Sequence, residues 1–135
     1  MKRFTHVAFL LFIILSAISC DKSAIDGEWD DNIHLSEKNI TISAEANKVL
    51  ITTKGTSWWI AGILLYDDSD YDISDTDTTQ EDFLIETEDF SIERKNTKEI
   101  HVSMTQNNTG SERTLTVSLQ AGNYFDGFQV HQSAN

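Results

Sequence analysis

The chain has 135 residues and a formal net charge of −12, with 22 Asp and Glu against 10 Lys and Arg. This length suits one domain with a modest core. So acidic a chain disfavours nucleic acid and anionic lipid head groups as partners. One cysteine and no proline are present. A disulfide within the chain and a thiolate-rich metal site are therefore excluded.

The first 20 residues have the pattern of a secretion signal that ends in a lipid-attachment cysteine. Lys2 and Arg3 precede an almost uncharged apolar run over residues 4–15, and small residues follow up to Cys20. The run is about a dozen residues long, whereas a helix needs about 20 to span a bilayer. A positive head, a short apolar helix and a small-residue end are typical of a removable signal peptide, here residues 1–19.

The end of this segment, Ala17-Ile18-Ser19-Cys20, resembles bacterial lipoprotein signals. The resemblance implies cleavage before Cys20 and acyl chains on this residue, which would anchor the protein in the membrane. It implies an outer-membrane lipoprotein of the cell envelope and leaves open whether the protein faces the periplasm or the exterior. An uncleaved anchor, or an ordinary signal with an incidental cysteine, is the alternative.

Residues 20–36 are polar and acidic, and we expect a flexible tether that holds the folded domain off the membrane. Cleavage before Cys20 would leave eight Lys and Arg against 22 Asp and Glu, a formal charge of −14. Two apolar residues of the tether, Trp29 and Ile33, are expected to dock on the domain.

From about residue 38 onward, apolar and polar residues alternate with a period of two. Such alternation, rich in Ile, Val, Thr and aromatic residues, predicts half-buried strands. Turn signals at residues 54–56, 107–110 and 121–123 separate the stretches. Strands at this spacing are typical of a β-sandwich or a barrel. The alternating stretches cover residues 40–44, 49–52, 58–66, 83–85, 90–92, 100–105, 114–119 and 128–131.

Residues 67–82 interrupt this rhythm with a dense run of acidic residues and few apolar ones. Like charges this close together repel and resist compaction. We expect a long exposed loop inserted between two strands, and loops of this length are usually functional or disordered.

The second half of the chain contains a characteristic order of motifs. A predicted strand is followed by the Asn-rich turn at 107–110, then by Glu112 and Arg113, and then by a second alternating strand. The last predicted strand ends in Phe128-Gln129-Val130-His131-Gln132. This order resembles the closing strands of BACON domains, found in Bacteroidetes surface proteins, and the resemblance covers about residues 38–133.

The resemblance implies an all-β, immunoglobulin-like antiparallel β-sandwich of about seven strands over residues 37–135. It also implies glycan or mucin binding, or a role as a spacer. Within the motif, Gly110 is expected to supply the positive φ that closes a hairpin. Arg113 is expected to have a structural role, reaching back to turn carbonyls, Glu112 or Glu99.

Aromatic residues are the candidates for a carbohydrate site, because the C–H faces of sugars stack on rings while hydroxyls pair with planar polar groups. Trp58 and Trp59 are adjacent in a predicted strand and so point to opposite faces. Only one of them belongs in the core, and the other is an exposed platform or lies under the acidic loop. Further aromatic residues near predicted loop ends are Tyr66, Tyr71, Tyr124 and Phe125.

The acidic loop contains one candidate metal site. Asp68, Asp70 and Asp72 match the first, third and fifth ligand positions of a calcium loop. Ile73 stands where that loop needs Gly, and Thr79 stands where it needs a bidentate Glu. Calcium is thus the one candidate cofactor, and a solvated acidic loop is the alternative.

The last two kinds of candidate site are a site of covalent modification and a catalytic site. Asp77-Thr78-Thr79 resembles the acceptor of Bacteroidetes protein O-glycosylation, with Thr78 as the modified residue. The sequence contains no nucleophile elbow, no His-Glu-x-x-His and no phosphate-binding glycine loop. His101 and His131 lie on outward phases of their strands, where they are expected to be neighbours that are solvated and do not bind a metal. We therefore expect no enzyme.

These patterns together predict a lipid-anchored, non-catalytic binding module of the cell envelope, with glycans as the first ligand class. The membrane partner is contacted through acyl chains on Cys20, and no nucleic acid is expected. The alternative is a structural or accessory lipoprotein without a small-molecule ligand, which docks on an envelope protein through its acidic loop or an exposed strand edge.

Overall fold

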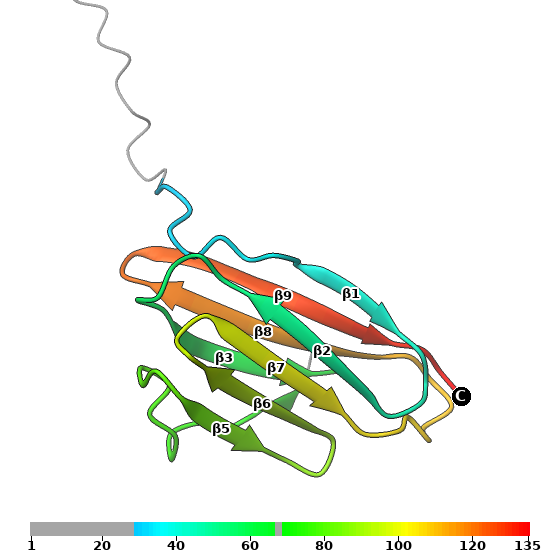
Figure 1. Cartoon of the computed structure of the whole chain (residues 1–135). Helices are drawn as coiled ribbons and strands as arrows, with labels where there is room; N and C mark the ends of the chain where they lie inside the picture. Colours follow the sequence, from blue (N-terminus) through cyan, green and yellow to red (C-terminus); the bar gives the residue numbers. More distant parts are fainter. Residues whose placement is uncertain (1–28, 67–68) are drawn as a thin grey trace, which may run out of the picture.

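The computed structural model describes residues 29–66 and 69–135, which form a two-layered β-sandwich (Figure 1). One sheet has five strands in the order β1-β9-β8-β3-β4, and the other has four in the order β2-β7-β6-β5. The strands are β1 (Asn39–Ile42), β2 (Asn47–Thr52), β3 (Trp59–Leu65), β4 (Ser69–Asp70), β5 (Phe83–Glu86), β6 (Phe90–Lys95), β7 (Glu99–Met104), β8 (Arg113–Ala121) and β9 (Tyr124–Gln132).

The prediction of an all-β sandwich is confirmed, with two differences in detail. Nine strands are present in the described residues instead of about seven, and one of the nine is the two-residue β4. The pair β1–β9 is parallel, whereas every other strand pair is antiparallel. The signal peptide and Cys20 lie outside the described residues. In the part of the chain that is described, no helix is long and apolar enough to cross a membrane.

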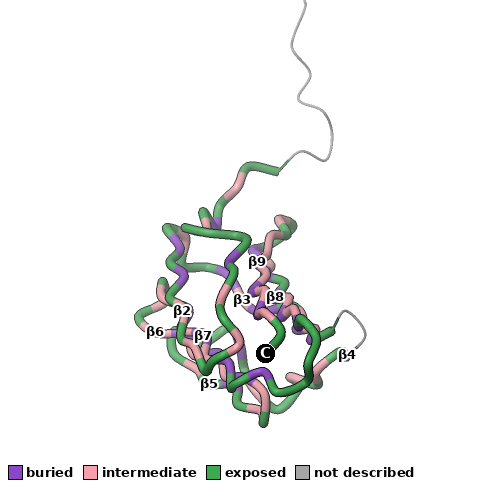
Figure 2. Tube along the Cα trace, turned by 90° about the vertical axis from the view of Figure 1, so that its right-hand side faces the viewer, coloured by how far each residue is buried: buried purple, intermediate pink, exposed green. Residues whose placement is uncertain are grey.

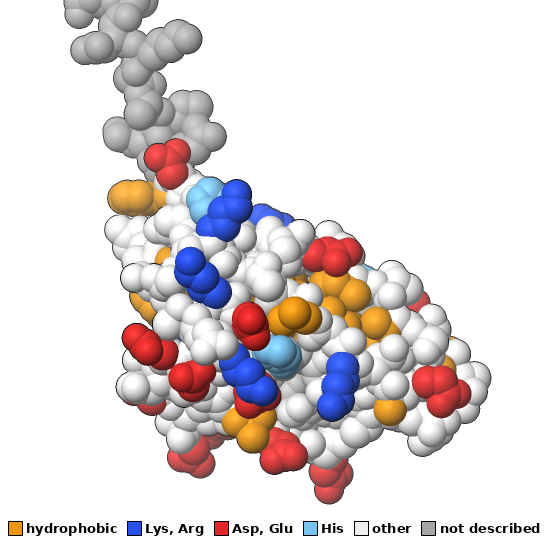
Figure 3. Space-filling view, in the orientation of Figure 1, with side chains coloured by type: hydrophobic (Ala, Val, Ile, Leu, Met, Phe, Trp, Pro, Cys, Tyr) orange, Lys and Arg blue, Asp and Glu red, His pale blue; other side chains and the backbone are white. Residues whose placement is uncertain are grey.

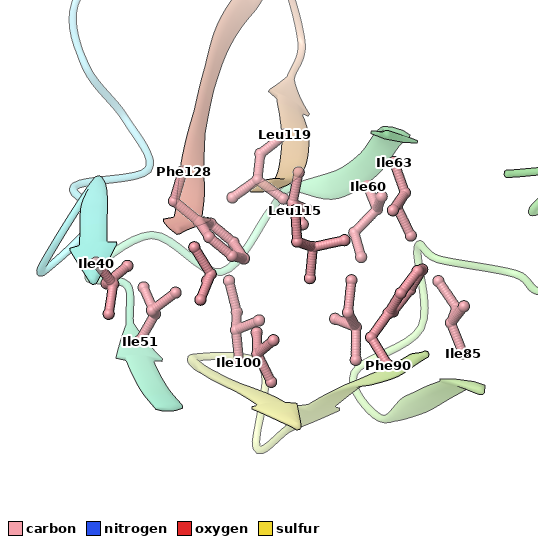
Figure 4. Packing of buried hydrophobic residues seen from close by; sticks show 14 of the residues in the cluster. Ile40, Ile51, Ile60, Ile63, Ile85, Phe90, Ile100, Leu115, Leu119 and Phe128 are labelled. Atoms are coloured by element: carbon pink, nitrogen blue, oxygen red, sulfur yellow. The ribbon is translucent and has the colours of Figure 1, made fainter. Parts of the chain in front are cut away.

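The core lies between the two sheets and follows directly from the alternation in sequence. Along β8, buried residues occur at every second position, and β6 and β7 show the same period. Figure 4 shows Ile60, Leu115 and Phe128 of one sheet facing Ile100 and Phe90 of the other. Figure 2 shows buried positions alternating with more exposed ones along the strands.

The domain begins earlier than residue 37, which corrects the predicted end of the tether. Ile33 is 0% exposed and belongs to the core. Its carbonyl accepts hydrogen bonds from the backbone N–H groups of Lys54 and Gly55, at 3.1 and 3.0 Å. Of the two apolar residues expected to dock, Ile33 does so, whereas Trp29 is largely exposed.

Residues 69–82 are exposed at most positions, as expected for the acidic loop, but the segment does not resist compaction and runs beside the edge of β3. β4 pairs with the end of β3, the Tyr71 N–H donates to the Ile63 carbonyl at 3.0 Å, and the Thr78 hydroxyl donates to the Ile60 carbonyl at 3.1 Å. Polar groups along a strand edge need partners, and this segment supplies them. Tyr71 and Ile73, placed between the acidic residues, pack on the core.

Two buried arginines connect separate parts of the sandwich through hydrogen bonds. Immunoglobulin-like domains often have a disulfide between the two sheets, which this chain cannot form with its single cysteine. Arg113 on β8 donates to Gln132 Oε1 at 2.7 Å and to Asp89 Oδ1 at 2.9 Å, and also to the Thr105 carbonyl. Its structural role and its contact with a turn carbonyl match expectation. The carboxylate partner is Asp89, not Glu112 or Glu99, because Asp89 lies in the turn that the opposite sheet presents to Arg113. Gly110 has the positive φ expected, 77°.

Arg94 on β6 is the second buried arginine. Its guanidinium donates to the carbonyls of Trp58, Gln80 and Thr56 at 2.9, 2.9 and 2.6 Å, and to that of Thr97 at 3.0 Å. Burial lowers the pKa of Arg94, and the nearby negative charges of Asp82 and Glu81 oppose that shift. The arginine thereby joins the approach to β3, the end of the acidic segment and the β6–β7 turn.

Candidate functional site

The outer face of the five-stranded sheet carries a row of two aromatic residues with an amide between them. Trp59 on β3 pairs with Gln120 on β8, and Gln120 pairs with Phe125 on β9. Paired residues of antiparallel strands project to the same side of the sheet. Phe125 is 64% exposed, and Trp59 and Gln120 are half-buried. We call these three residues the aromatic row.

The neighbouring Trp58 takes the opposite direction and belongs to the core. It is 2% exposed, and its indole Nε1–H donates to Thr53 Oγ1 at 3.0 Å. The guanidinium of Arg94 lies 3.7 Å from the centroid of its ring. Of the two adjacent tryptophans, Trp59 is therefore the one that faces solvent, and Trp58 is corrected as a ligand candidate.

A second row, next to the aromatic row, has minimal side chains. Gly62, Ser118 and Gly127 are paired across the same three strands, and we call them the low row. Gly127 on β9 has no room for a side chain, because an added Cβ would lie 2.5 Å from the Val117 carbonyl oxygen of β8. Beside Gly62, a hollow of about 430 Å³ extends toward residues 70–74. The low row thus forms a floor beside the aromatic row.

The next row forms the far side of this floor. Leu64, Thr116 and Gln129 are paired across β3, β8 and β9. The Gln129 side-chain amide donates to Thr116 Oγ1 at 3.1 Å. This face therefore combines two aromatic rings, a low centre and several uncharged hydrogen-bonding groups.

The three tyrosines predicted for the site do not join this row. Tyr66 and Tyr71 lie at the opposite end of β3, where Tyr71 packs edge-on against Phe90 with ring centroids 4.8 Å apart. Tyr124 lies in the β8–β9 hairpin but pairs with buried Ala121, so its ring is on the inner phase. Of the aromatic candidates, the structure therefore brings Trp59 and Phe125 together on one face, whereas the three tyrosines lie elsewhere.

Tyr124 has its own polar surroundings at the edge of the core. Its hydroxyl donates to Asp126 Oδ2 at 3.2 Å, and Lys38 Nζ lies 2.8 Å from the same oxygen. Burial raises the pKa of Tyr124 to about 12, and the negative charges of Asp126 and Asp31 act in the same direction. The phenol is therefore a hydrogen-bond donor over the ordinary pH range.

The predicted calcium ligands are described only in part. Asp68 lies outside the described residues, and Asp70 is exposed on β4. Asp72 Oδ1 accepts the backbone N–H of Ser74 at 2.9 Å, which lowers the pKa of this carboxyl. Across residues 29–66 and 69–135, no three His, Cys, Asp or Glu side chains gather in a way that could hold a metal ion. Calcium binding stays a prediction.

The remaining candidates lie apart from one another. The expectation that Thr78 is an accessible acceptor is corrected, because Thr78 is buried and its hydroxyl donates to the Ile60 carbonyl. His101 lies on the four-stranded sheet, 2.8 Å from Glu99 Oε2. His131 lies on the other sheet, 3.0 Å from Thr114 Oγ1. The two histidines face outward from different sheets, so they are not neighbours.

The outer face of the four-stranded sheet has a different character. Leu50, His101, Glu93 and Leu84 are paired in one row across β2, β7, β6 and β5. Lys95 Nζ lies 3.0 Å from Glu93 Oε2. Figure 3, in the orientation of Figure 1, shows Lys, His and acidic side chains close together on the visible face. This face is charged, whereas the aromatic row lies among uncharged residues.

Comparison with known proteins supports the fold. The structure is similar to an NMR structure of a protein from Bacteroides thetaiotaomicron, with a TM-score of 0.63 and 24% identity over 86% of this chain and 98% of that one. A Bacteroides ovatus GH5 xyloglucanase, solved with a XXXG heptasaccharide, matches with a TM-score of 0.43 and 20% identity over 73% of this chain and 17% of that one. No protein family and no curated protein matches the sequence.

Sequence reasoning identified Trp59 and Phe125 as aromatic candidates but missed Gln120, which joins them. The sequence feature that indicates an outward Gln120 is its place between the apolar residues Leu119 and Ala121, both of which are buried in the structure. Strand register, which brings residues 59, 120 and 125 into one row, comes from the structure.

Proposed function

We propose that this protein is a non-catalytic binding module of the cell envelope that binds a glycan on its aromatic row. The observation that carries this proposal is the exposure of Phe125, 64%, in register with Trp59 across Gln120. Exposed apolar groups that lie together with polar residues around them mark ligand-binding surfaces, and Trp59 and Phe125 lie in one row with Gln120 between them. Sugar C–H faces stack on such rings, and an amide offers both a donor and an acceptor to hydroxyls.

The attachment to the envelope is part of the same proposal. Cys20 as a lipid-attachment residue, followed by the acidic residues up to the domain, would hold the binding face away from the bilayer. The resemblance to BACON domains and the similar fold of a Bacteroides protein support this setting. A binding module needs no catalytic residues, and in this proposal the stacking contacts come from the aromatic row.

A glycan panel that includes neutral, acidic and mucin-type glycans tests this function with the full-length protein in detergent. Binding to at least one glycan is expected, and Phe125→Ala and Trp59→Ala should weaken it. Leu50→Ala is the matched control, because Leu50 is 53% exposed on the other sheet. Absence of binding to every glycan, or equal binding by wild type and Phe125→Ala, contradicts the proposal.

Docking on an envelope protein is the second candidate function. It is favoured by two exposed apolar residues, Leu50 and Leu84, at the two edges of the four-stranded sheet. Exposed apolar groups at sheet edges are common in protein contacts. If this function holds, Leu50→Ala and Leu84→Ala, but not Phe125→Ala, should abolish co-purification of an envelope protein after cross-linking in cells.

A further inference from the structure

We propose that the glycan of the aromatic row is neutral and extended, and that it lies across the strands with Trp59 and Phe125 under alternate sugar rings. This inference rests on the proposed function and adds the class of the ligand. It depends on three features of the face: its charge, the spacing of its rings and the shape of its centre.

The first feature is the absence of positive charge among the outward residues of the three central strands. Within β3, β8 and β9, the only titratable outward residue is His131, which lies three rows from the aromatic row. Asp70 and Asp72 lie beside the hollow next to Gly62. The whole chain has a formal charge of −12. A sialylated, sulfated or uronate glycan would meet repulsion and no basic partner, so the face favours a neutral ligand. The outward residues concerned are Trp59, Gly62, Leu64, Thr114, Thr116, Ser118, Gln120, Phe125, Gly127, Gln129 and His131.

The second feature is the spacing between the rings. Trp59 and Phe125 are separated by one strand, and neighbouring strands are about 4.8 Å apart, so the two backbone positions are roughly 10 Å apart. In an extended β-linked glycan, each sugar ring adds a length of little more than one strand spacing. The two aromatic rings therefore match rings i and i+2, which present the same face in a ribbon with a twofold twist. Gln120 lies below the ring between them.

The third feature is the low row, which leaves room beside the bound glycan. Gly62 and Gly127 have no side chains, so the exocyclic groups of the sugar rings can lie over the floor. Ser118 in its middle is exposed and offers a hydroxyl to them. The far side ends at the hydrogen-bonded pair of Gln129 and Thr116. A ligand lying along the strands would instead contact only one of the two aromatic rings.

Calorimetric titration of the full-length protein in detergent, with a length series and a charge series, tests the inference. The neutral probes are cello-, xylo- and manno-oligosaccharides of two to six units, and the acidic probes are oligogalacturonates of the same lengths and sialylated mucin glycans. We expect affinity for one neutral series to rise between two and four units, where both rings become engaged. Phe125→Ala and Trp59→Ala should each weaken binding of the hexamer about tenfold, and neither should weaken binding of the dimer to the same extent.

Each result supports or overturns the inference. Binding of acidic glycans only, or affinity for a dimer equal to that for a hexamer, together with loss on Phe125→Ala, overturns the neutral extended ligand and leaves the proposed function standing. Absence of any glycan binding overturns both. Lys95→Ala, which removes an exposed ion pair on the opposite sheet, should bind the hexamer as wild type does, and a matching loss in this variant would move the site away from the aromatic row.

Discussion

The guanidinium of Arg94 lies 3.7 Å from the centroid of the Trp58 ring, while one of its nitrogens donates to the Trp58 carbonyl at 2.9 Å. Arg94 thus holds both the ring and the backbone of the residue that precedes β3. Because the next residue is Trp59, the same contact fixes where the aromatic row begins. The core and the candidate site are connected through two adjacent residues that point in opposite directions.

Replacing Arg94 is expected to destabilise the fold strongly. Arg94→Ala would remove the side-chain donor from the buried carbonyl of Trp58 and from the part-buried carbonyls of Gln80 and Thr97. A buried acceptor that loses its donor costs about 1–3 kcal/mol, and Arg94 donates to several carbonyls at once. Urea unfolding followed by tryptophan fluorescence measures the change, and Arg94→Lys should recover little, because an ammonium cannot reach the same carbonyls.

The control for this variant is Lys95→Ala, one residue further along β6. Lys95 forms an exposed ion pair with Glu93 at 3.0 Å. Exposed pairs of this kind are worth about 0–1 kcal/mol. Equal effects of Arg94→Ala and Lys95→Ala on the free energy of unfolding would contradict the role given to Arg94.

The two adjacent tryptophans should respond in opposite ways to truncation. Trp58→Ala removes a buried ring and should lower the free energy of unfolding by about 3–5 kcal/mol. Trp59→Ala, on the solvent side of the same strand, should lower it by less than about 1 kcal/mol. Denaturant unfolding followed by circular dichroism compares the two. A larger loss for Trp59→Ala would mean that the assignment of the two faces is reversed.

Much of the fold could be predicted from the sequence, because half-buried strands impose a period of two. The stretches 100–105 and 114–119 fall within β7 and β8 or at their ends. The charge density of residues 69–82 predicts an exposed loop but not its packing, which depends on the hydrogen-bonding needs of the β3 edge and on the fit of Tyr71 and Ile73 to the core. The docking of Ile33 is predicted by its apolar character, but the start of the domain at this residue is not, because its neighbours are polar and its place depends on contacts with residues 54–55.

The candidate site was less predictable, because it depends on register. Alternation requires Trp58 and Trp59 to face opposite sides but does not decide which side is the core. Trp58 is on the core side because its indole N–H donates to Thr53 Oγ1 there and its ring packs against the Arg94 guanidinium. Phe125 lies near Trp59 only through the pairing of both strands with β8, and no local pattern contains that information.

Two glycines of the low row form a matched pair for a test of backbone packing. An added Cβ at Gly127 would lie 2.5 Å from the Val117 carbonyl oxygen, whereas at Gly62 it would meet nothing within 4 Å. Gly127→Ala should therefore destabilise the domain by about 1–3 kcal/mol through overpacking. Gly62→Ala should be neutral or stabilising by about 0.5–1 kcal/mol, because glycine weakens a strand interior. Thermal unfolding of both variants measures the difference, and a Gly127→Ala variant as stable as wild type would show that β8 and β9 separate easily.

Cys20 provides a test of the proposed anchor. Cys20→Ala should move the protein out of the membrane fraction, because the acyl chains that bind the bilayer would be missing. Cell fractionation with mass measurement of the product records both location and processing. Ser23→Ala, three residues further along, is the control and should stay in the membrane fraction. A Cys20→Ala protein that is processed normally and remains membrane-bound would exclude lipid attachment at this residue.

Tyr124 should make stability fall at alkaline pH. Burial raises its folded pKa to about 12, whereas an unfolded tyrosine has a pKa of about 10. Below pH 10 the phenol is protonated in both states, so its contribution to stability is fully present. Between about pH 10 and 12 the unfolded chain releases the proton while the folded chain keeps it, so the contribution is lost as the pH rises. Tyr124→Phe should flatten this decrease and reduce the phenolate absorbance change near pH 12, to which Tyr71 also contributes because burial raises its pKa as well. An absorbance change near pH 12 of the same size in Tyr124→Phe as in wild type would contradict the environment described for Tyr124.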